Sequence, residues 1–565
     1  MDHPPGSLVS LTEHDVPVPM RDGAILRAIV TRPADGRPAP VVLVRTPYPL
    51  AESRAEIDAI GVAQRGLVLV LQSVRGTGRS DGEFSPWIHE AEDGFDSIAW
   101  CSALPWSDGN VATLGRSYLA QAQVLAAGER PAALRAMALD VVGDDPYEVQ
   151  WRNGALGLGA SLGWSVAMAG ISLERAEARG EDVRAERSVW LAAMNDMPAV
   201  YRRTPLADFG GLERHMPGWL DLLAHPTRDA WWQAAVPPER EPLPTIIVAG
   251  WHDLFIAGSL RQFAIAARNA ASRLIVGPWS HTSAQSALGD VYYGAMASAA
   301  AQGLDARRLD FLDAHLRGAD TGRGGVHLFV MGANQWRDFD SWPPAPSRDL
   351  ELFLRPGGRL AEGPAGAAAD GGEVQPSTFV FDPRDPVPTV GGANLMAWAD
   401  AMDGSGACDQ RQLDGRADIL RFATEPLGDA FEVIGSVRLT LFAATSAVDT
   451  DWTGKLVDVY PDGRAFNVVD SIVRARLRDA SHEAPLQPDR PHEFTFELGP
   501  TAQRFAAGHR IRLDISSSNF PRFDRNPGTG GSSATAPEAT FISARQSVFH
   551  DAAHPSRLTL PVFEG

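Results

Sequence analysis

Short apolar runs that alternate with helical patterns constrain the fold of this chain more than any other feature. The helical patterns include residues 91–104, where Phe95, Ile98 and Ala99 fall on one face. The apolar runs have the uninterrupted, β-branched composition of parallel strands buried on both faces, and they occupy residues 40–44, 67–71, 111–114 and 136–142. This alternation predicts an α/β fold with a doubly wound sheet.

A serine follows one of these runs at a strand-to-helix junction. The run 111–114 leads into Gly115 and Ser117, and an alanine-rich helical pattern begins at once. This order is typical of a nucleophile elbow, a tight turn that makes the serine hydroxyl project from the sheet edge. The match is partial, because Leu119 stands where the usual motif has its second glycine and Ala120 follows. On this pattern alone, a serine that caps an ordinary helix is an equal alternative.

The length of the chain, 565 residues, favours about three domains. Residues 146–238 carry tryptophan, alanine, glycine and helical charge pairs without a clear strand. Strand patterns return at residues 244–250 and 273–277. We therefore expect a sheet domain in two segments, residues 1–145 and 239–348, with a helical cap inserted between them.

The last part of the chain, residues 349–565, has a different sequence pattern. Its strand patterns are short, separated by Pro, Gly and Asp, and have no helices between them, which indicates a jelly-roll β-sandwich. They lie at residues 419–422, 437–441, 456–459, 494–498, 511–515 and 558–562.

Composition excludes several classes of partner and chemistry. The formal net charge of -19 argues against nucleic acid or an anionic membrane as a partner, because phosphate binding needs a basic face. Lys455 is the only lysine, which leaves little room for Schiff-base chemistry. The two cysteines, Cys101 and Cys408, form no metal or disulfide pattern and are expected to be reduced.

Targeting and metal-binding patterns are also missing from the sequence. We find neither a signal peptide nor a run of about 20 apolar residues, so we expect a cytoplasmic enzyme. No His-Glu-x-x-His pattern occurs, and we expect His89 and Glu90 to be an exposed pair. No metal or other cofactor is expected.

A nucleophilic serine needs a base within hydrogen-bond reach and an acid that orients the base. In doubly wound hydrolases the acid and then the histidine follow the serine in the chain, each at the end of a strand. Asp253 and His281 satisfy this order. Asp140 also ends a strand, but it follows the elbow helix directly and a structural role is favoured. His252 adjoins Asp253 and should point to the opposite side of an extended backbone.

A series of motifs surrounds these residues, at positions 19–23, 45–48, 75–82, 106–110, 115–118, 250–253 and 277–281, and a C-terminal signature lies at 516–527. Together they resemble the motifs of the cocaine-esterase and X-prolyl dipeptidyl-peptidase group of α/β-hydrolases. The resemblance covers nearly the whole chain and implies an α/β-hydrolase domain, a helical cap and a C-terminal jelly roll that helps to close the site.

The resemblance also implies further site residues. Tyr48 corresponds to the family's tyrosine whose hydroxyl forms the oxyanion hole, together with the backbone N–H of Tyr118. Trp151, Trp164 and Phe255 correspond to aromatic residues of the acyl pocket, although they could simply fill the core of the cap.

Arg116 departs from the family pattern. We expect it to pair with a local carboxylate, and the alternative is a positive potential that suits anionic substrates.

The resemblance leaves more than one activity open. Residues 254–258, after Asp253, contain no acid that could hold a substrate ammonium group. We therefore expect a serine hydrolase of small-molecule carboxylic esters with a bulky, aromatic acyl group. The alternatives are an X-prolyl dipeptidyl peptidase or α-amino-acid ester hydrolase on the same scaffold and, in another class, a catalytically inactive carbohydrate-binding protein. A homodimer is left open.

Overall fold

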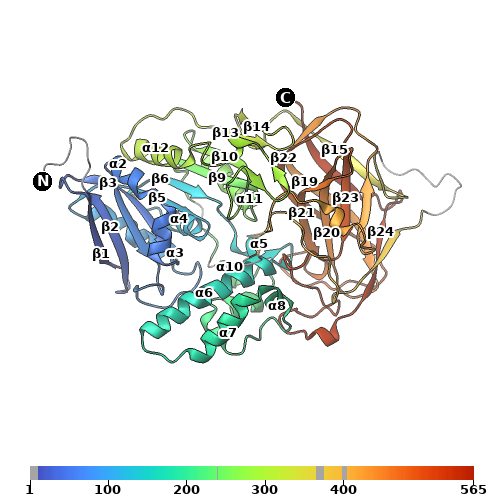
Figure 1. Ribbon diagram of the computed structural model, residues 1–565, viewed down its shortest axis with the longest axis horizontal. Coiled ribbons are helices and arrows are strands. Elements are labelled where there is room, and N and C mark those ends of the chain that lie inside the picture. Colours follow the sequence, from blue (N-terminus) through green and yellow to red (C-terminus); the bar gives the residue numbers. More distant parts are fainter. Residues whose placement is uncertain (1–9, 234, 238–239, 364–373, 397–403) are drawn as a thin grey trace.

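The computed structural model describes residues 10–233, 235–237, 240–363, 374–396 and 404–565. Three bodies are visible in Figure 1. A sheet with flanking helices is formed by the blue and green segments, a body of strands lies beside it in orange and red, and a group of teal helices lies below both.

The first body is built on a ten-stranded sheet. Its strand order is β1-β2-β4-β3-β5-β6-β9-β10-β13-β14. The strands from β4 to β13 along this order run parallel to their neighbours, and antiparallel strands lie at both edges. The bounds are β1 Ser10–Pro19, β2 Ile25–Pro33, β3 Ala39–Thr46, β4 Val68–Ser73, β5 Ser107–Arg116, β6 Leu134–Asp140, β9 Thr245–His252, β10 Arg273–Ser280, β13 Val326–Val330 and β14 Gln335–Phe339.

Helices cover both faces of this sheet. Val41 and Leu43 belong to one apolar core, whereas Val42 and Val44 belong to the other, as the two-residue period of a strand requires. Helices α3, α4 and α11 contribute to the first core, and α2 and α12 contribute to the second. The bounds are α1 Leu50–Glu56, α2 Ala59–Gln64, α3 Glu90–Ala103, α4 Tyr118–Gly128, α11 Ile256–Ala266 and α12 Leu304–Leu316. The predicted doubly wound α/β fold is therefore confirmed.

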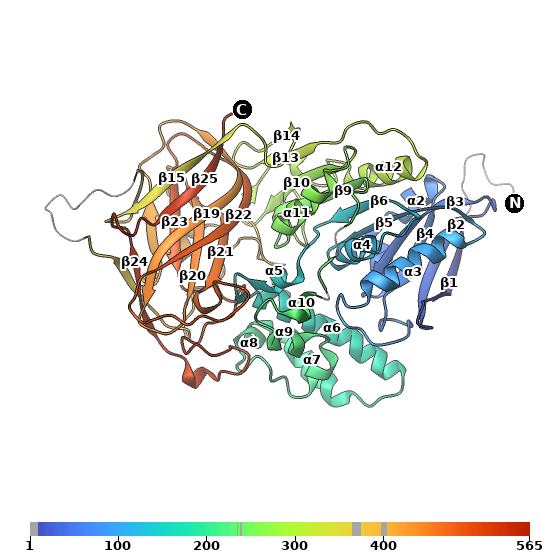
Figure 2. The same ribbon diagram turned by 180° about the vertical axis from the view of Figure 1, so that it is seen from behind.

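The teal helices lie between β6 and β9 in the chain and have a core of their own. Figure 2 shows them beneath the other two bodies. This cap also contains a short antiparallel pair of strands, which the sequence does not predict. Its elements are α5 Pro146–Gln150, β7 Trp151–Arg152, β8 Ala155–Leu156, α6 Leu158–Ala178, α7 Arg184–Asn195, α8 Met197–Arg202, α9 Trp219–Ala224 and α10 Ala230–Gln233.

The C-terminal body is β-rich, with a large core of Leu, Val, Ile and Phe side chains. Almost all of its strand pairs are antiparallel. The strands are β15 Ser347–Arg355, β16 Arg359–Glu362, β17 Ser377–Phe381, β18 Leu420–Ala423, β19 Phe431–Thr445, β20 Asp451–Val459, β21 Ala465–Arg474, β22 His492–Phe505, β23 Arg510–Ser516, β24 Ala544–Phe549 and β25 Arg557–Phe563. The predicted β-rich C-terminal domain is confirmed.

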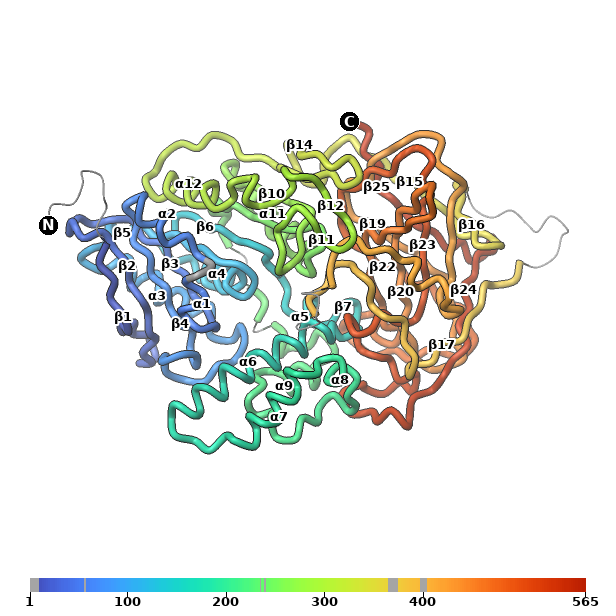
Figure 3. Tube along the Cα trace, in the orientation of Figure 1, coloured from blue at the N-terminus to red at the C-terminus, as the bar shows by residue number. Residues whose placement is uncertain are grey.

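The cap contacts both neighbouring bodies. In Figure 3 the teal trace passes directly from β6 into α5 and β7, next to the orange strands. The Leu156 N–H donates to the Asp524 carboxylate at 3.0 Å, and the Arg474 N–H donates to the Asn153 carbonyl at 3.0 Å. The expected boundary between residues 238 and 239 lies outside the described residues, and the other domain boundaries stay predictions.

Two further expectations concern single features. Cys101 and Cys408 are not joined in a disulfide, as expected. Among the helices of the described residues, none is long and apolar enough to cross a membrane.

Candidate active site

Ser117 lies on a sharp turn between β5 and α4. Its backbone has φ 55° and ψ −124°, a left-handed conformation that is uncommon for a residue with a Cβ atom. The Ser117 N–H donates to the Asp140 carbonyl of neighbouring β6 at 2.9 Å, and the Ser117 carbonyl accepts from the Ala120 and Gln121 N–H groups. The turn is therefore held by β6 and by the first turn of α4, as in a nucleophile elbow.

Gly115 and Leu119 explain why the partial motif still forms this turn. A Cβ atom at Gly115 would lie 2.5 Å from the Leu119 Cβ atom, so only glycine fits here without a shift. Leu119 belongs to the apolar core on the α12 face of the sheet. The elbow thus keeps its first glycine, and the leucine in place of the second packs over it.

The three residues predicted from their strand ends lie in one hydrogen-bonded chain. His281 Nε2 lies 2.9 Å from Ser117 Oγ, and His281 Nδ1 lies 2.9 Å from Asp253 Oδ2. Asp253 is fully buried, and its other oxygen accepts from the Phe255 N–H at 2.6 Å. An oriented acid therefore holds the imidazole, whose second nitrogen faces the serine.

The side chains of the competing residues have other partners. Asp140 forms an ion pair with Arg308. The imidazole of His252 is buried and its Nε2 lies 3.0 Å from the Tyr293 hydroxyl, whereas Asp253 turns to His281. The opposite orientation of these two neighbours follows from the extended backbone at the end of β9.

Arg116 joins the loop of Ser117 to the loop of His281. Its guanidinium donates a hydrogen bond to the backbone carbonyl of His281. Within the described part of the chain no carboxylate forms an ion pair with Arg116, so the expected local pairing is wrong. The expectation failed because the partner is a carbonyl 165 residues away in the sequence.

A buried ion pair that the sequence does not predict supports the residue after Ser117. The Tyr118 hydroxyl donates to Glu90 Oε1 at 2.9 Å, and Glu90 Oε2 lies 2.7 Å from a guanidinium nitrogen of Arg45. Burial, followed by the negative charge of Glu90, raises the pKa of Tyr118 well above its usual value. Glu90 is buried, so the expected exposed His89-Glu90 pair is wrong.

Tyr118 is the first residue of α4. The Ala120 and Gln121 N–H groups donate to the Ser117 carbonyl, whereas the first N–H of a helix has no carbonyl partner within it, so the Tyr118 N–H can face an anion in front of α4. Tyr48 lies in the loop after β3, and its hydroxyl accepts a hydrogen bond from the Trp164 indole at 3.1 Å.

Aromatic rings cluster around Tyr118 and Trp164. Trp164 stacks on Tyr118 and on Trp87, with ring centroids 6.1 and 6.3 Å apart. Phe84 contacts both Tyr118 and Trp164. Phe84 and Trp87 were not predicted, because they lie in a loop whose sequence has no period.

The other two predicted pocket residues differ in their surroundings. Phe255 packs edge-on against the His281 imidazole, with ring centroids 5.1 Å apart. Trp151 is buried in the core of the cap, and its part in a substrate pocket stays a prediction.

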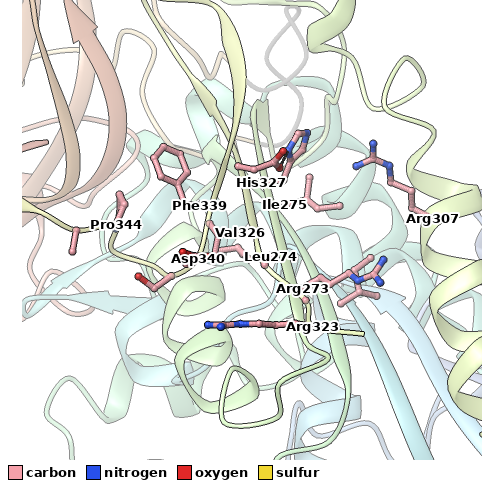
Figure 4. Close-up of a pocket in the computed structure, with 16 residues that line it drawn as sticks. Arg273, Leu274, Ile275, Arg307, Arg323, Val326, His327, Phe339, Asp340 and Pro344 are labelled. Carbon is pink, nitrogen blue, oxygen red and sulfur yellow. Dashed lines mark hydrogen bonds and ion pairs between the residues drawn. The ribbon is translucent and has the colours of Figure 1, made fainter. Parts of the chain in front are cut away.

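A groove apart from these residues lies at the amino ends of the parallel strands. It has a volume of about 910 Å³ and is lined by the first residues of β10 and β13, Arg273, Leu274 and Val326, and by Arg307 and Arg323 (Figure 4). Ser117, Asp253 and His281 follow the carboxyl ends of their strands, where parallel sheets place their active sites. The groove of Figure 4 is therefore separate from the candidate active site.

Comparison with known proteins gives a consistent assignment. Residues 22–283 match the X-Pro dipeptidyl-peptidase (S15) family, and residues 318–559 match the X-Pro dipeptidyl-peptidase C-terminal non-catalytic domain. The chain is 38% identical to the cocaine esterase of Rhodococcus sp. (strain MB1 Bresler), over 97% of this chain and 98% of that protein.

Two solved structures share the whole architecture. An aminopeptidase from the marine sediment archaeon Thaumarchaeota archaeon has a TM-score of 0.81 and 25% identity, over 100% of this chain and 98% of its own. An α-amino acid ester hydrolase has a TM-score of 0.80 and 27% identity, over 98% of this chain and 96% of its own. The chain therefore belongs to the X-Pro dipeptidyl-peptidase (S15) and cocaine-esterase family of hydrolases.

Proposed function

We propose that this protein is a serine ester hydrolase whose catalytic triad is Ser117, His281 and Asp253. The hydrogen-bonded chain of these three side chains, at the carboxyl ends of β5, β10 and β9, is the observation that carries the proposal. The family includes esterases and peptidases, and the cocaine esterase is an ester hydrolase by its name.

The reaction is an acyl transfer in two steps. His281 Nε2 takes the hydroxyl proton of Ser117 while Oγ forms a bond to the ester carbonyl carbon. The carbon–oxygen bond to the alcohol then breaks, and the imidazolium gives its proton to the leaving oxygen. Water repeats the sequence on the acyl-enzyme and releases the acid. Asp253 orients the imidazole and stabilises its positive charge throughout.

The backbone N–H of Tyr118 and the hydroxyl of Tyr48 form the oxyanion hole in this proposal. Tyr118 begins α4, so its N–H lies at the positive end of a helix that starts beside the nucleophile. The bond from Trp164 to Tyr48 supports an orienting role for the tryptophan.

The substrate is a carboxylic ester with a bulky, aromatic acyl group. Phe255 against His281, and Trp164 against Tyr118, support an apolar pocket beside the nucleophile. We assign Trp151 to the wall of the same pocket. Residues 254–258 supply no carboxylate for a substrate ammonium, which disfavours the X-prolyl and amino-acid ester alternatives. A benzoate ester compared with an X-Pro amide separates these activities directly.

Replacement of the nucleophile tests the proposal. Ser117→Ala should lower kcat for a chromogenic aryl benzoate by at least about 10,000-fold, because the covalent route is lost. Thermal unfolding should be nearly unchanged. Ser102→Ala is a matched control, since the Ser102 hydroxyl donates to the Ala99 carbonyl of its own helix. Near-normal turnover in Ser117→Ala would contradict the triad.

A further inference from the structure

Arg152 lies where the cap, the hydrolase domain and the β-rich domain meet. It ends the short strand β7 of the cap, directly after Trp151. Its side chain is half-buried and lines two adjoining pockets. Leu254 of the hydrolase domain and Arg522 of the β-rich domain line both pockets with it.

The Arg152 guanidinium has no partner among the described residues: no carboxylate, carbonyl or aromatic ring pairs with its side chain. The nearby carboxylates are bound to other arginines. Glu148 accepts from Arg228 at 3.0 Å, and Asp144 accepts from Arg261 at 2.7 Å. A positive charge that is partly withdrawn from water without a counter-charge costs some free energy, so an anion beside Arg152 would be stabilised.

The two pockets beside Arg152 differ in the charges that line them. One pocket is lined by two arginines, Asn394 and apolar or glycine residues, and no carboxylate lines it. Three acids line the other pocket. Asp470 is paired with Arg522 at 2.7 Å, Asp253 holds His281, and Glu497 is exposed.

Burial is the main cause that lowers the pKa of the Arg152 guanidinium, and the positive charges of Arg522 and Arg261 act in the same direction. Glu148 and Asp144 act against them. An anion bound in the pocket would offset both the burial and the repulsion. A carboxylate suits a guanidinium best, because two parallel N–H groups can bind its two oxygens.

The pocket adjoins the candidate active site through a single residue. Leu254 lines it, and its neighbours in the chain are Asp253, which holds the His281 imidazole, and Phe255, which packs on the same ring. Asp253 itself lines the second pocket, so Arg152 lies in a pocket that borders the residue holding the His281 imidazole.

We propose that Arg152, assisted by Arg522, binds a carboxylate carried by the substrate, so that the enzyme prefers esters with a negative charge remote from the scissile bond. This inference rests on the proposed esterase activity and narrows its substrate class. The carboxylate can belong to the acyl part or to the alcohol part of the ester, and the two sources are separated by experiment.

The test compares two pairs of esters with the purified full-length protein. The first pair carries the charge on the acyl part: the mono-4-nitrophenyl ester of isophthalic acid and its neutral methyl-capped form. The second pair carries it on the alcohol part: 3-carboxyphenyl benzoate and its methyl ester. The wild-type protein should have a kcat/KM about 10- to 100-fold higher for the charged member of one pair, as expected for a hydrogen-bonded charge pair. The pair that shows this preference identifies the source.

Variants then connect the preference with Arg152. Arg152→Gln should abolish the preference, mainly through KM, while kcat/KM for neutral esters stays within about 2-fold. Arg152→Lys should restore part of it, because the charge returns without the two parallel donors. Arg187→Gln is a matched control, since that cap arginine pairs with Glu177 at 2.8 Å on the surface.

Each outcome decides between the claims. Hydrolysis of neutral esters with no preference for charged ones would overturn the Arg152 inference alone. A preference that persists in Arg152→Gln, or an equal loss on charged and neutral esters, would also overturn it. Failure to hydrolyse any of the four esters would contradict the esterase function, and this inference with it.

Discussion

Arg116 directly precedes Ser117, the proposed nucleophile, and reaches the loop of His281, the proposed base. Its guanidinium donates to the His281 carbonyl, so one side chain links the end of β5 to the end of β10. It does not touch the reacting atoms, and we regard it as a positioning residue. A small displacement of the base matters greatly in catalysis, because the proton transfer from the serine depends on distance and angle.

Removal of this bond should therefore affect the chemical step. Arg116→Leu should lower kcat for an aryl benzoate by about 10-fold, the effect of losing a hydrogen bond from a charged donor, with KM nearly unchanged. Arg116→Lys should recover part of the loss, because an ammonium can still donate to the carbonyl. Steady-state kinetics on the purified variants measure both values.

Arg135 offers a control for the loss of an arginine near the same strand. It is exposed, and its guanidinium donates to the Asn110 side chain at 2.8 Å. Arg135→Leu should leave kcat unchanged. A normal kcat in Arg116→Leu, or a fall in kcat without rescue by lysine, would contradict the positioning role.

At the scale of single residues, the candidate site residues Ser117, Asp253 and His281 could be predicted because each follows the end of a strand. Each follows an apolar run that the sequence marks clearly, and the carboxyl ends of parallel strands converge. Glu90 and Arg45 carry no such mark. Their pairing bridges 45 residues and appears only when α3 packs over β3, so the sequence indicated an exposed glutamate where the structure buries one.

At the scale of elements, the segment after β23 fastens the cap to the β-rich domain. Asp524 accepts from the Leu156 N–H of β8 at 3.0 Å and from the Arg474 guanidinium of β21 at 2.8 Å. Arg474 is buried and also pairs with Asp451 at 2.8 Å. This explains why the C-terminal signature includes an aspartate at this point.

Loss of this carboxylate should destabilise the protein strongly. Asp524→Asn leaves Arg474 buried with one anion instead of two, and breaking a buried pair costs about 3–5 kcal/mol. The midpoint of thermal unfolding, followed by calorimetry on the full chain, should fall by several degrees.

An exposed pair provides the comparison. Asp489 lies 2.9 Å from Arg545 on the surface of the same domain. Asp489→Asn should change the midpoint little, because exposed pairs contribute about 0–1 kcal/mol. Equal midpoints for the two variants would contradict the fastening role of Asp524.

The elements of the β-rich domain were predicted less completely than those of the sheet domain. Residues 437–441 mark only the centre of β19, which has 15 residues and a β-bulge after Val437. Strand β21 escaped prediction although all its residues are buried, because Asn467, Asp470 and Ser471 break its apolar pattern. Asn467 bonds to Gly406 and Cys408, and Asp470 bonds to Asn519 and Arg522. These partners lie in loops far along the chain and cannot be read from the strand alone.

At the scale of the whole molecule, the three bodies converge on the residues after Asp253. Leu254 belongs to the hydrolase domain, Arg152 to the cap and Arg522 to the β-rich domain, and all three line the same pockets. The sequence predicted three bodies from changes in the pattern of apolar residues along the chain. The pattern changes because each body forms its own hydrophobic core. The sequence could not indicate a binding role for Arg152, because its pockets form only where the surfaces of the three bodies meet.

The central claim is that Ser117 is the nucleophile, and labelling tests it most directly. A fluorophosphonate probe reacts covalently with an activated serine, and mass spectrometry of the digested protein locates the adduct. The account predicts a single adduct on Ser117 in the wild-type protein, and a loss of labelling in His281→Gln because the base is absent. An adduct on another serine, or undiminished labelling of Ser117 in His281→Gln, would contradict it.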